Sequence, residues 1–292
     1  MLKHKEMKIK ESIKKLSDAI EQADAVVVGA GAGLSAAAGF SYSGARFTEW
    51  CSPWEEKYDV HDFYSAGFCF FDSHEDFWGY WSASILANRY ECAVGKPYLQ
   101  LKSLLEGKDY FVITTNVDHQ FQRAGFDKKR LFYTQGDYGL FQCGKPCCQE
   151  TFDNEEMVRA MHAATVGTAI PSGLIPRCPH CGAELTTNLR CDDSFVQDEG
   201  WHRAAERYSL FLRRHEGLCV LFLELGVGFN TPVIIKYPFW QMTSENKKAV
   251  FATINRGEAY AHPAITDRSI TIDSDIAQVI DQLLAMREGD GK

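Results

Sequence analysis

Residues 25–35 of the 292-residue chain read AVVVGAGAGLS. The apolar run at 25–28 is typical of a short strand that is buried on both faces of a parallel sheet. The glycines after it permit a tight turn, and small residues lead on into a helix. Such a turn lets a phosphate approach free backbone N–H groups at the start of the helix. The stretch predicts either a phosphate-binding strand–loop–helix unit or simply a crowded strand–helix turn.

The glycine spacing disfavours two common functions of such a loop. It departs from the G-x-G-x-x-G pattern of dehydrogenases, and no acidic residue ends a second strand about 20 residues later. No lysine of the P-loop type follows the glycines either. A hydride-transferring dehydrogenase and a nucleoside triphosphatase are therefore both disfavoured.

The rest of the chain alternates strand patterns with helix patterns, which predicts an α/β fold with a Rossmann-type, doubly wound parallel sheet. Ligands of such sheets bind at the carboxyl ends of the strands. The predicted helices are 13–23, 98–105, 201–215 and 276–286, and the predicted strands are 25–28, 110–113, 131–134, 218–225, 233–236 and 249–255. We assign 1–142 and 194–292 to the Rossmann-type domain, with an aromatic helical insert or lid at 47–95, and 143–193 to a small zinc-binding module.

Composition narrows the class of protein. A formal charge of −8 gives no broad basic surface, so we expect no nucleic-acid partner. The longest apolar stretch, 219–229, is interrupted by Glu224 and is too short to span a membrane. The N-terminus is charged where an export signal would be apolar, and the ten cysteines then indicate a reducing compartment. We expect a cytoplasmic protein.

Two pairs of cysteines have the spacing of a four-thiolate zinc site. They are Cys143 with Cys147 and Cys178 with Cys181. Cys148 is an alternative to Cys147, but its side chain is expected to point away. Disulfides are the other interpretation, which a reducing compartment disfavours. Four protein ligands leave no open position, so the predicted zinc is structural.

The second polar motif is TTNVD at 114–118, which directly follows a predicted strand and precedes Ala124-Gly125. Its position at the carboxyl end of the strand favours a ligand site. Asn and Asp are also common helix N-caps, so the motif alone favours a helix cap and a ligand site equally.

Taken together, these motifs resemble the sirtuins over residues 10–285. The resemblance rests on GAGLS at 31–35, Gly39, TTNVD, Ala124-Gly125, the cysteine pairs, LGVG at 225–228, INR at 254–256 and DSD at 273–275. It implies that NAD is the co-substrate. It assigns catalytic roles to Asn116, Asp118 and Gln135. The implied cofactor-binding residues are Gly31, Ala32, Gly33, Leu34, Ser35, Gly39, Thr115, Asn116, Asp118, Gln135, Gly226, Val227, Gly228, Asn255, Arg256 and Ile276.

Three segments of this sequence depart from the pattern of the deacylase sirtuins, and all three belong to one part of the implied site. Gln135, in YTQGDYG, stands where deacylase sirtuins carry a histidine, and an amide cannot act as a general base. SYSG at 41–44 replaces Pro-Asp-Phe-Arg, with Arg46 and Phe47 displaced. The Phe-Gly-Glu that grips acyl-lysine is absent, and NLRCDDSF stands at 188–195 instead. The pattern resembles the microbial class M sirtuins.

The resemblance to class M implies a protein ADP-ribosyltransferase. It further implies a lipoylated carrier protein, related to the glycine-cleavage H protein, as acceptor and a macrodomain hydrolase as partner. Lysine deacylation, NAD hydrolysis and a non-catalytic NAD or ADP-ribose sensor stay open as alternatives. His119, which follows Asp118 directly, is a further hypothesis for a substitute base.

Overall fold

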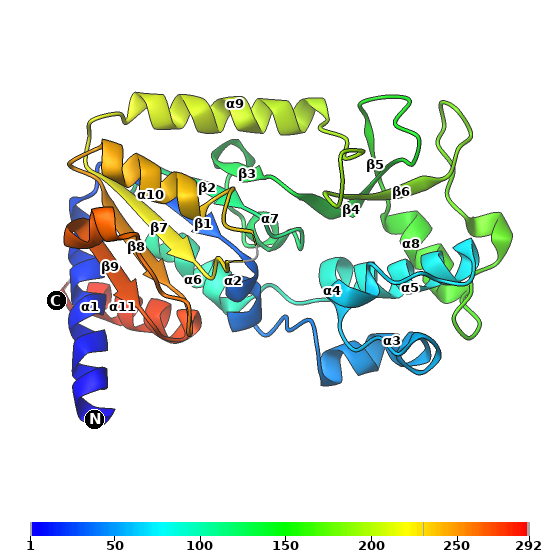
Figure 1. Cartoon of the computed structure of the whole chain (residues 1–292), viewed down its shortest axis with the longest axis horizontal. Coiled ribbons are helices and arrows are strands. Elements are labelled where there is room, and N and C mark those ends of the chain that lie inside the picture. Colours follow the sequence, from blue (N-terminus) through cyan, green and yellow to red (C-terminus); the bar gives the residue numbers. More distant parts are fainter. Residues whose placement is uncertain (1, 230, 291–292) are drawn as a thin grey trace.

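The computed structural model describes residues 2–229 and 231–290. It confirms the α/β prediction, because its main sheet is six-stranded and all its pairings are parallel, in the order β3-β2-β1-β7-β8-β9 (Figure 1). The strands are β1 Ala25–Ala30, β2 Tyr110–Thr114, β3 Leu131–Tyr133, β7 Val220–Leu225, β8 Val250–Ile254 and β9 Ser269–Ile272.

The register of the sheet brings the predicted motifs to one edge. Ala30, the last residue of β1, lies opposite Thr114 of β2 on one side and Leu225 of β7 on the other. The glycine loop, TTNVD and the 226–228 loop therefore all leave the sheet at the same end. The sequence order reverses direction between β1 and β7, which is where α/β sheets bind their ligands.

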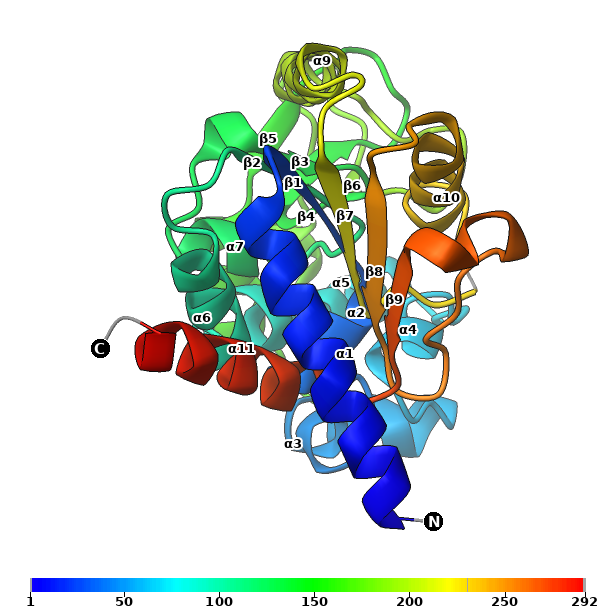
Figure 2. The same ribbon diagram turned by 90° about the vertical axis from the view of Figure 1, so that its left-hand side faces the viewer.

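Helices cover both faces of the sheet, and every residue of β1 is buried for this reason (Figure 2). Val26 and Val28 share a core with Ile13, Leu101 and Ile280, which lie on the helices of one face. Those helices are α1 Leu2–Gln22, α6 Lys96–Leu104 and α11 Ile276–Asp290. The alternate residues of β1 pack with the other face, which is covered by α9 Glu199–Arg214 and α10 Lys236–Glu245.

The predicted strand at 233–236 is wrong. Residues 232–235 form turns that lead into α10, and Val233 is exposed. Ile235 and Phe239 are fully buried and lie four residues apart, which is the spacing of a helix face. The sixth strand is instead β9, which the sequence analysis missed.

The other end of the molecule combines the aromatic insert with a three-stranded antiparallel sheet of order β5-β4-β6 (Figure 1). Trp54, Trp78, Phe141 and Val158 share one core, and the rings of Trp78 and Phe141 are 4.9 Å apart. The aromatic residues there are thus largely packing. The elements are α3 Ala45–Tyr58, α4 Phe63–Ala66, α5 His74–Ile85, the π-helical η1 Leu86–Tyr90, β4 Gly136–Cys143, β5 Thr151–Asp153, α8 Glu155–Ala163, η3 Ser172–Leu174 and β6 Leu185–Leu189.

Four short elements complete the chain. They are α2 Ala32–Ala37, α7 Gln120–Arg123, η2 Lys128–Arg130 and η4 Pro263–Arg268. No helix among the described residues combines the length and the apolar character that a membrane span requires.

Candidate active site at the carboxyl edge of the sheet

The glycine loop is fixed by backbone contact with the loop after β7. The Gly31 N–H donates to the Leu225 carbonyl and the Gly33 N–H to the Gly226 carbonyl, each at 3.0 Å. A Cβ atom on Gly33 would lie 2.6 Å from the Gly226 Cα, which is too close for any side chain. Gly226 itself has a φ of +63°. The close approach of these two backbone segments is therefore sufficient to require glycine here.

A buried polar network connects the glycine loop to TTNVD. The Ser35 hydroxyl donates to Asp118 Oδ2 at 2.5 Å and lies 2.8 Å from the Tyr98 hydroxyl. The Asn116 side-chain amide donates to the Gly31 carbonyl at 3.0 Å and to the Tyr98 hydroxyl at 3.3 Å. Three of the predicted site residues, Ser35, Asn116 and Asp118, thus meet around one tyrosine.

Tyr98 was not predicted as a site residue. It lies in the apolar face of α6 and is fully buried, so the helical pattern reads it as core. The one available signal was its hydroxyl, which requires a hydrogen-bond partner when a tyrosine is buried.

Asp118 is a buried carboxylate whose surroundings oppose its charge. Burial raises its pKa, although the Ser35 hydroxyl and the Gln120 backbone N–H, at 3.1 Å, favour the ionised form. Such a carboxylate gains by accepting a further hydrogen bond from an amide or hydroxyl. Asp118 is therefore well suited to hold a neutral polar group of a ligand.

Gln135 lies in the turn between β3 and β4, and this turn is rigidly held. Its carbonyl accepts from the Arg190 N–H at 3.0 Å, and the Tyr138 N–H donates to the Val117 carbonyl at 2.9 Å. Gly136 has a φ of +94°, and a Cβ atom there would lie 1.8 Å from the Asn188 carbonyl oxygen. The half-buried Gln135 amide has no hydrogen-bond partner within the described part of the chain.

The predicted cofactor-binding residues that follow β7 and β8 divide into loop residues and a core residue. The Asn255 side-chain amide donates to the Val227 carbonyl at 3.3 Å, so these two residues meet beyond β7 and β8. Arg256 is mostly exposed and pairs with Asp275 at 3.0 Å. Ile276 is 3% exposed and belongs to the hydrophobic core, so its side chain packs beneath the loops.

The remaining predicted cofactor residues lie at the same edge. The Thr115 N–H donates to the Ala30 carbonyl at 3.1 Å, which extends the β1–β2 ladder into the loop. Gly39 has a φ of +90° in the turn after α2. Ala32 begins α2, Leu34 is buried in the core, and Gly228 is half-buried after β7.

The four predicted zinc ligands form one cluster. Four sulfur atoms, those of Cys143, Cys147, Cys178 and Cys181, all lie within 4.8 Å of one another. The distance between the two sulfurs is 3.6 Å both for Cys143 with Cys181 and for Cys147 with Cys178. A tetrahedral ion with Zn–S bonds of about 2.3 Å separates its sulfurs by about 3.8 Å. All ten cysteines of the chain are free rather than disulfide-bonded. The cluster, which contains Cys147 and not Cys148, therefore fits a closed, structural zinc site.

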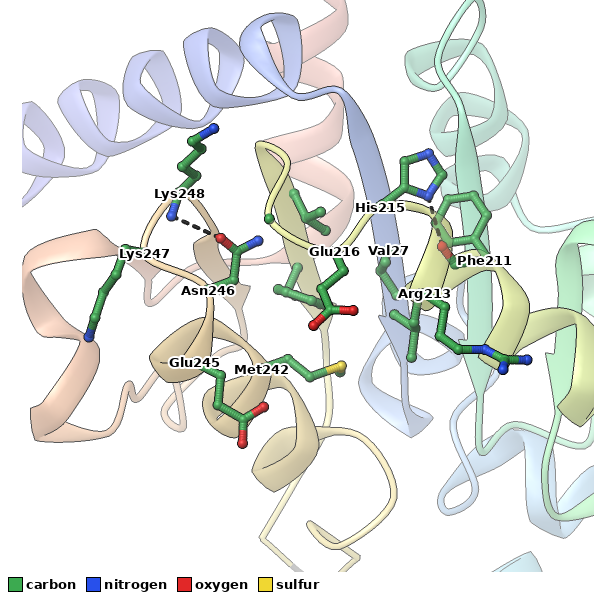
Figure 3. Close-up of a pocket in the computed structure, with 14 residues that line it drawn as sticks. Val27, Phe211, Arg213, His215, Glu216, Met242, Glu245, Asn246, Lys247 and Lys248 are labelled. Atoms are coloured by element: carbon green, nitrogen blue, oxygen red, sulfur yellow. Dashed lines mark hydrogen bonds between the residues drawn. The ribbon is translucent and has the colours of Figure 1, made fainter.

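A separate cavity of about 540 Å³ lies between α9 and α10 (Figure 3). Its lining includes Val27, Phe211 and Met242 and the loops that precede β7 and β8. These loops are at the amino end of the sheet, opposite the carboxyl edge. The cavity is thus no part of the candidate active site.

The fold and site define a Rossmann-type protein with a four-cysteine cluster that fits zinc and a polar network, at the carboxyl ends of its strands, that is suited to NAD. No family model matches the chain. A Sir2Tm structure bound to a propionylated peptide covers 95% of this chain and 98% of that one, with a TM-score of 0.60 at 17% identity. A Sir2 homologue mutant in complex with ADP-ribose covers 95% and 97%, with a TM-score of 0.57 at 19% identity. A Sir2 structure with a peptide and NAD covers 96% and 99%, with a TM-score of 0.57 at 17% identity.

Curated relatives narrow the class further. A Staphylococcus aureus (strain Mu50) protein named protein ADP-ribosyltransferase is 41% identical over 91% of this chain and 84% of its own length. A Fusarium oxysporum protein, named a probable bifunctional ADP-ribose hydrolase/ADP-ribosyltransferase, is 33% identical over 75% of this chain and 38% of its own length. The chain belongs to the family of the S. aureus protein ADP-ribosyltransferase, and its fold is that of the Sir2 structures.

Proposed function

We propose that the protein transfers ADP-ribose from NAD to a side chain of a protein acceptor. The observation that carries the proposal is Gln135, an amide in the turn beside TTNVD, in a chain 41% identical to a protein ADP-ribosyltransferase. An amide orients hydrogen-bonding groups but cannot take a proton near neutral pH. Position 135 therefore lacks the histidine base that deacylase sirtuins carry there.

The reaction replaces one bond at the anomeric carbon of the nicotinamide ribose. The bond from this carbon to nicotinamide breaks, its electron pair stays on the nicotinamide nitrogen, and an oxocarbenium-like transition state forms. The acceptor nucleophile then bonds to the same carbon and loses its proton. The products are the ADP-ribosylated acceptor, nicotinamide and a proton.

The described contacts support a role for each residue. Asp118 accepts a hydrogen bond from the nicotinamide carboxamide, because burial opposes the charge of its carboxylate and a further donor would stabilise that charge. Asn116 and Gln135 orient the ribose and the acceptor. The glycine loop from Gly31 to Ser35 lies along the pyrophosphate, and the 226–228 loop with Asn255 forms the adenosine end.

The acceptor in this proposal is a lipoylated carrier protein of the glycine-cleavage H type. A macrodomain hydrolase would remove the modification, and the Fusarium relative supports this pairing because its name joins an ADP-ribose hydrolase to an ADP-ribosyltransferase. The ten free cysteines fit a reducing compartment, and we place the reaction in the cytoplasm.

The acceptor is tested with NAD labelled in its adenylate and two forms of one purified carrier, lipoylated and unlipoylated. We expect label on the lipoylated form and little on the other. Equal label on both would remove the lipoyl group from the proposal. Nicotinamide release without label on protein would indicate an NAD hydrolase, and binding without nicotinamide release a sensor.

A further inference from the structure

Asp137 is a buried carboxylate at the edge of the candidate site, two residues after Gln135. It is 4% exposed, and its Oδ1 accepts from Arg89 Nε at 2.9 Å and from the Gly139 N–H at 2.7 Å. Its Oδ2 contacts His119 Nδ1. Burial alone would raise its pKa, but the His119 hydrogen bond and the Arg89 charge hold the pKa of Asp137 below its usual value. Asp137 is therefore an ionised carboxylate between two cationic or hydrogen-donating side chains.

This carboxylate determines how the His119 imidazole is used. A carboxylate that accepts at Nδ1 places the proton of the neutral ring there and leaves the lone pair on Nε2. Within the described residues Nε2 has no hydrogen-bond partner, and the His119 side chain is 27% exposed. The neutral ring thus has a free proton acceptor at Nε2.

The backbone of His119 has an unusual conformation. Its φ is +62°, and among the described residues other than glycine only Asp59 shares a positive φ. Such strained positions persist where the surrounding structure fixes them, and they cluster at functional sites.

Arg89 reaches Asp137 from the other end of the molecule. It lies in the π-helical turn η1, a kind of turn that is frequent at functional sites. Its carbonyl accepts from Arg123 Nη1 at 3.1 Å, and its side chain is 16% exposed. The insert therefore contributes a fixed cation behind Asp137.

The imidazole lies between the two loops that carry the proposed catalytic residues. His119 directly follows Asp118, and Asp137 follows Gln135 by two residues. The backbone bond from Tyr138 to Val117, at 2.9 Å, joins these loops beside the imidazole. A histidine is thus present at this edge, but it comes from position 119 rather than from position 135.

We propose that His119 is the general base of the transfer reaction and that Asp137 and Arg89 are positioning residues. The inference rests on the proposed ADP-ribosyl transfer. As the acceptor bonds to the anomeric carbon, its proton passes to His119 Nε2. The resulting imidazolium is stabilised by Asp137 and then releases the proton to solvent, so the overall reaction is unchanged.

His119→Asn is the decisive variant. Asparagine tolerates the positive φ and can donate to Asp137, but it cannot take a proton. We expect label transfer to fall about 10²-fold or more, with NAD affinity and thermal unfolding unchanged. His262→Asn is the matched control, because His262 is an exposed N-cap that asparagine can replace, and it should transfer at the wild-type rate.

Chemical rescue separates a base from a structural role. Added imidazole should restore part of the transfer by His119→Gly, in which the ring is missing. Asp137→Asn should lower kcat without raising the KM for NAD, and imidazole should not restore it, because His119 still fills the site. His119→Asn at the wild-type rate, or no rescue of His119→Gly by imidazole, would overturn the assignment of His119. Failure of the wild-type enzyme to label any protein would instead overturn the proposed function.

Discussion

At the scale of single residues, we propose that Gln135 separates this site from that of a deacylase. Its amide is unpaired among the described residues, and its turn is fixed by Gly136 and the Arg190 N–H. Gln135→Ala should lower label transfer roughly tenfold, the equivalent of one hydrogen bond of about 1.4 kcal/mol. Single-turnover rates with saturating NAD measure this loss.

Replacing Gln135 with histidine gives a complementary test. Gln135→His should not create an efficient lysine deacylase, because the acyl-lysine grip is also missing from 188–195. The assay is deacetylation of a lysine peptide by the purified variant. Rapid deacetylation would mean that position 135 alone decides the reaction type, contrary to this account.

The sequence predicted candidate site residues but not the contacts between them. TTNVD was predicted because it directly follows a strongly apolar strand. Tyr98 was missed because it lies in a regular helical pattern. The Asp137–His119 contact joins residues 18 positions apart across two loops, and no local pattern encodes it. Only the fold places Arg89 beside them.

At the scale of elements, the apolar runs of β1, β2 and β7 were predictable because both faces of these strands are buried. The error at 233–236 arose because a short apolar run is consistent with a strand or with a helix start. β9 was missed because Ser269–Ile272 alternates polar and apolar residues over only four positions.

A buried ion pair secures α10 to the sheet. Lys236 Nζ lies 2.6 Å from Glu224 Oε1, both side chains are fully buried, and the Thr253 hydroxyl donates to the same oxygen at 2.8 Å. Lys236→Met should destabilise the fold by about 3–5 kcal/mol, because it leaves an uncompensated buried charge. Lys236→Met combined with Glu224→Gln should recover most of that loss in urea denaturation. A single variant as stable as the wild type would show that the pair is not formed.

The zinc cluster makes a prediction for the antiparallel sheet. Cys143 lies at the end of β4, and Cys178 and Cys181 precede β6, so one ion would tie both strands together. Purified protein should contain about one zinc per chain. Cys181→Ser should lose the metal and unfold at a lower temperature, whereas Cys148→Ser should keep both properties. A metal-free wild type with freely titrating thiols would contradict the assignment.

At the scale of the whole molecule, the two ends have separate tasks. The parallel sheet supplies the NAD edge through backbone contacts such as Gly33 with Gly226. The other end supplies Arg89, which donates to Asp137, and its neighbours Leu86 and Tyr90 join the aromatic core. The sequence could predict the NAD edge and Gln135 from a familiar arrangement of motifs. It could not predict the contact of Arg89 with Asp137, because aromatic packing leaves no regular period.

The central claim is that NAD cleavage is coupled to a protein acceptor and not to an acyl-lysine. The direct measurement counts, in one reaction, nicotinamide released and ADP-ribose bound to acceptor protein, with Asn116→Ala as the inactive control. For ADP-ribosyl transfer, we expect that the two amounts agree mole for mole and that an acetyl-lysine peptide adds no nicotinamide release. Release that depends on the acetyl-lysine peptide, with deacetylated product and no label on protein, would contradict it.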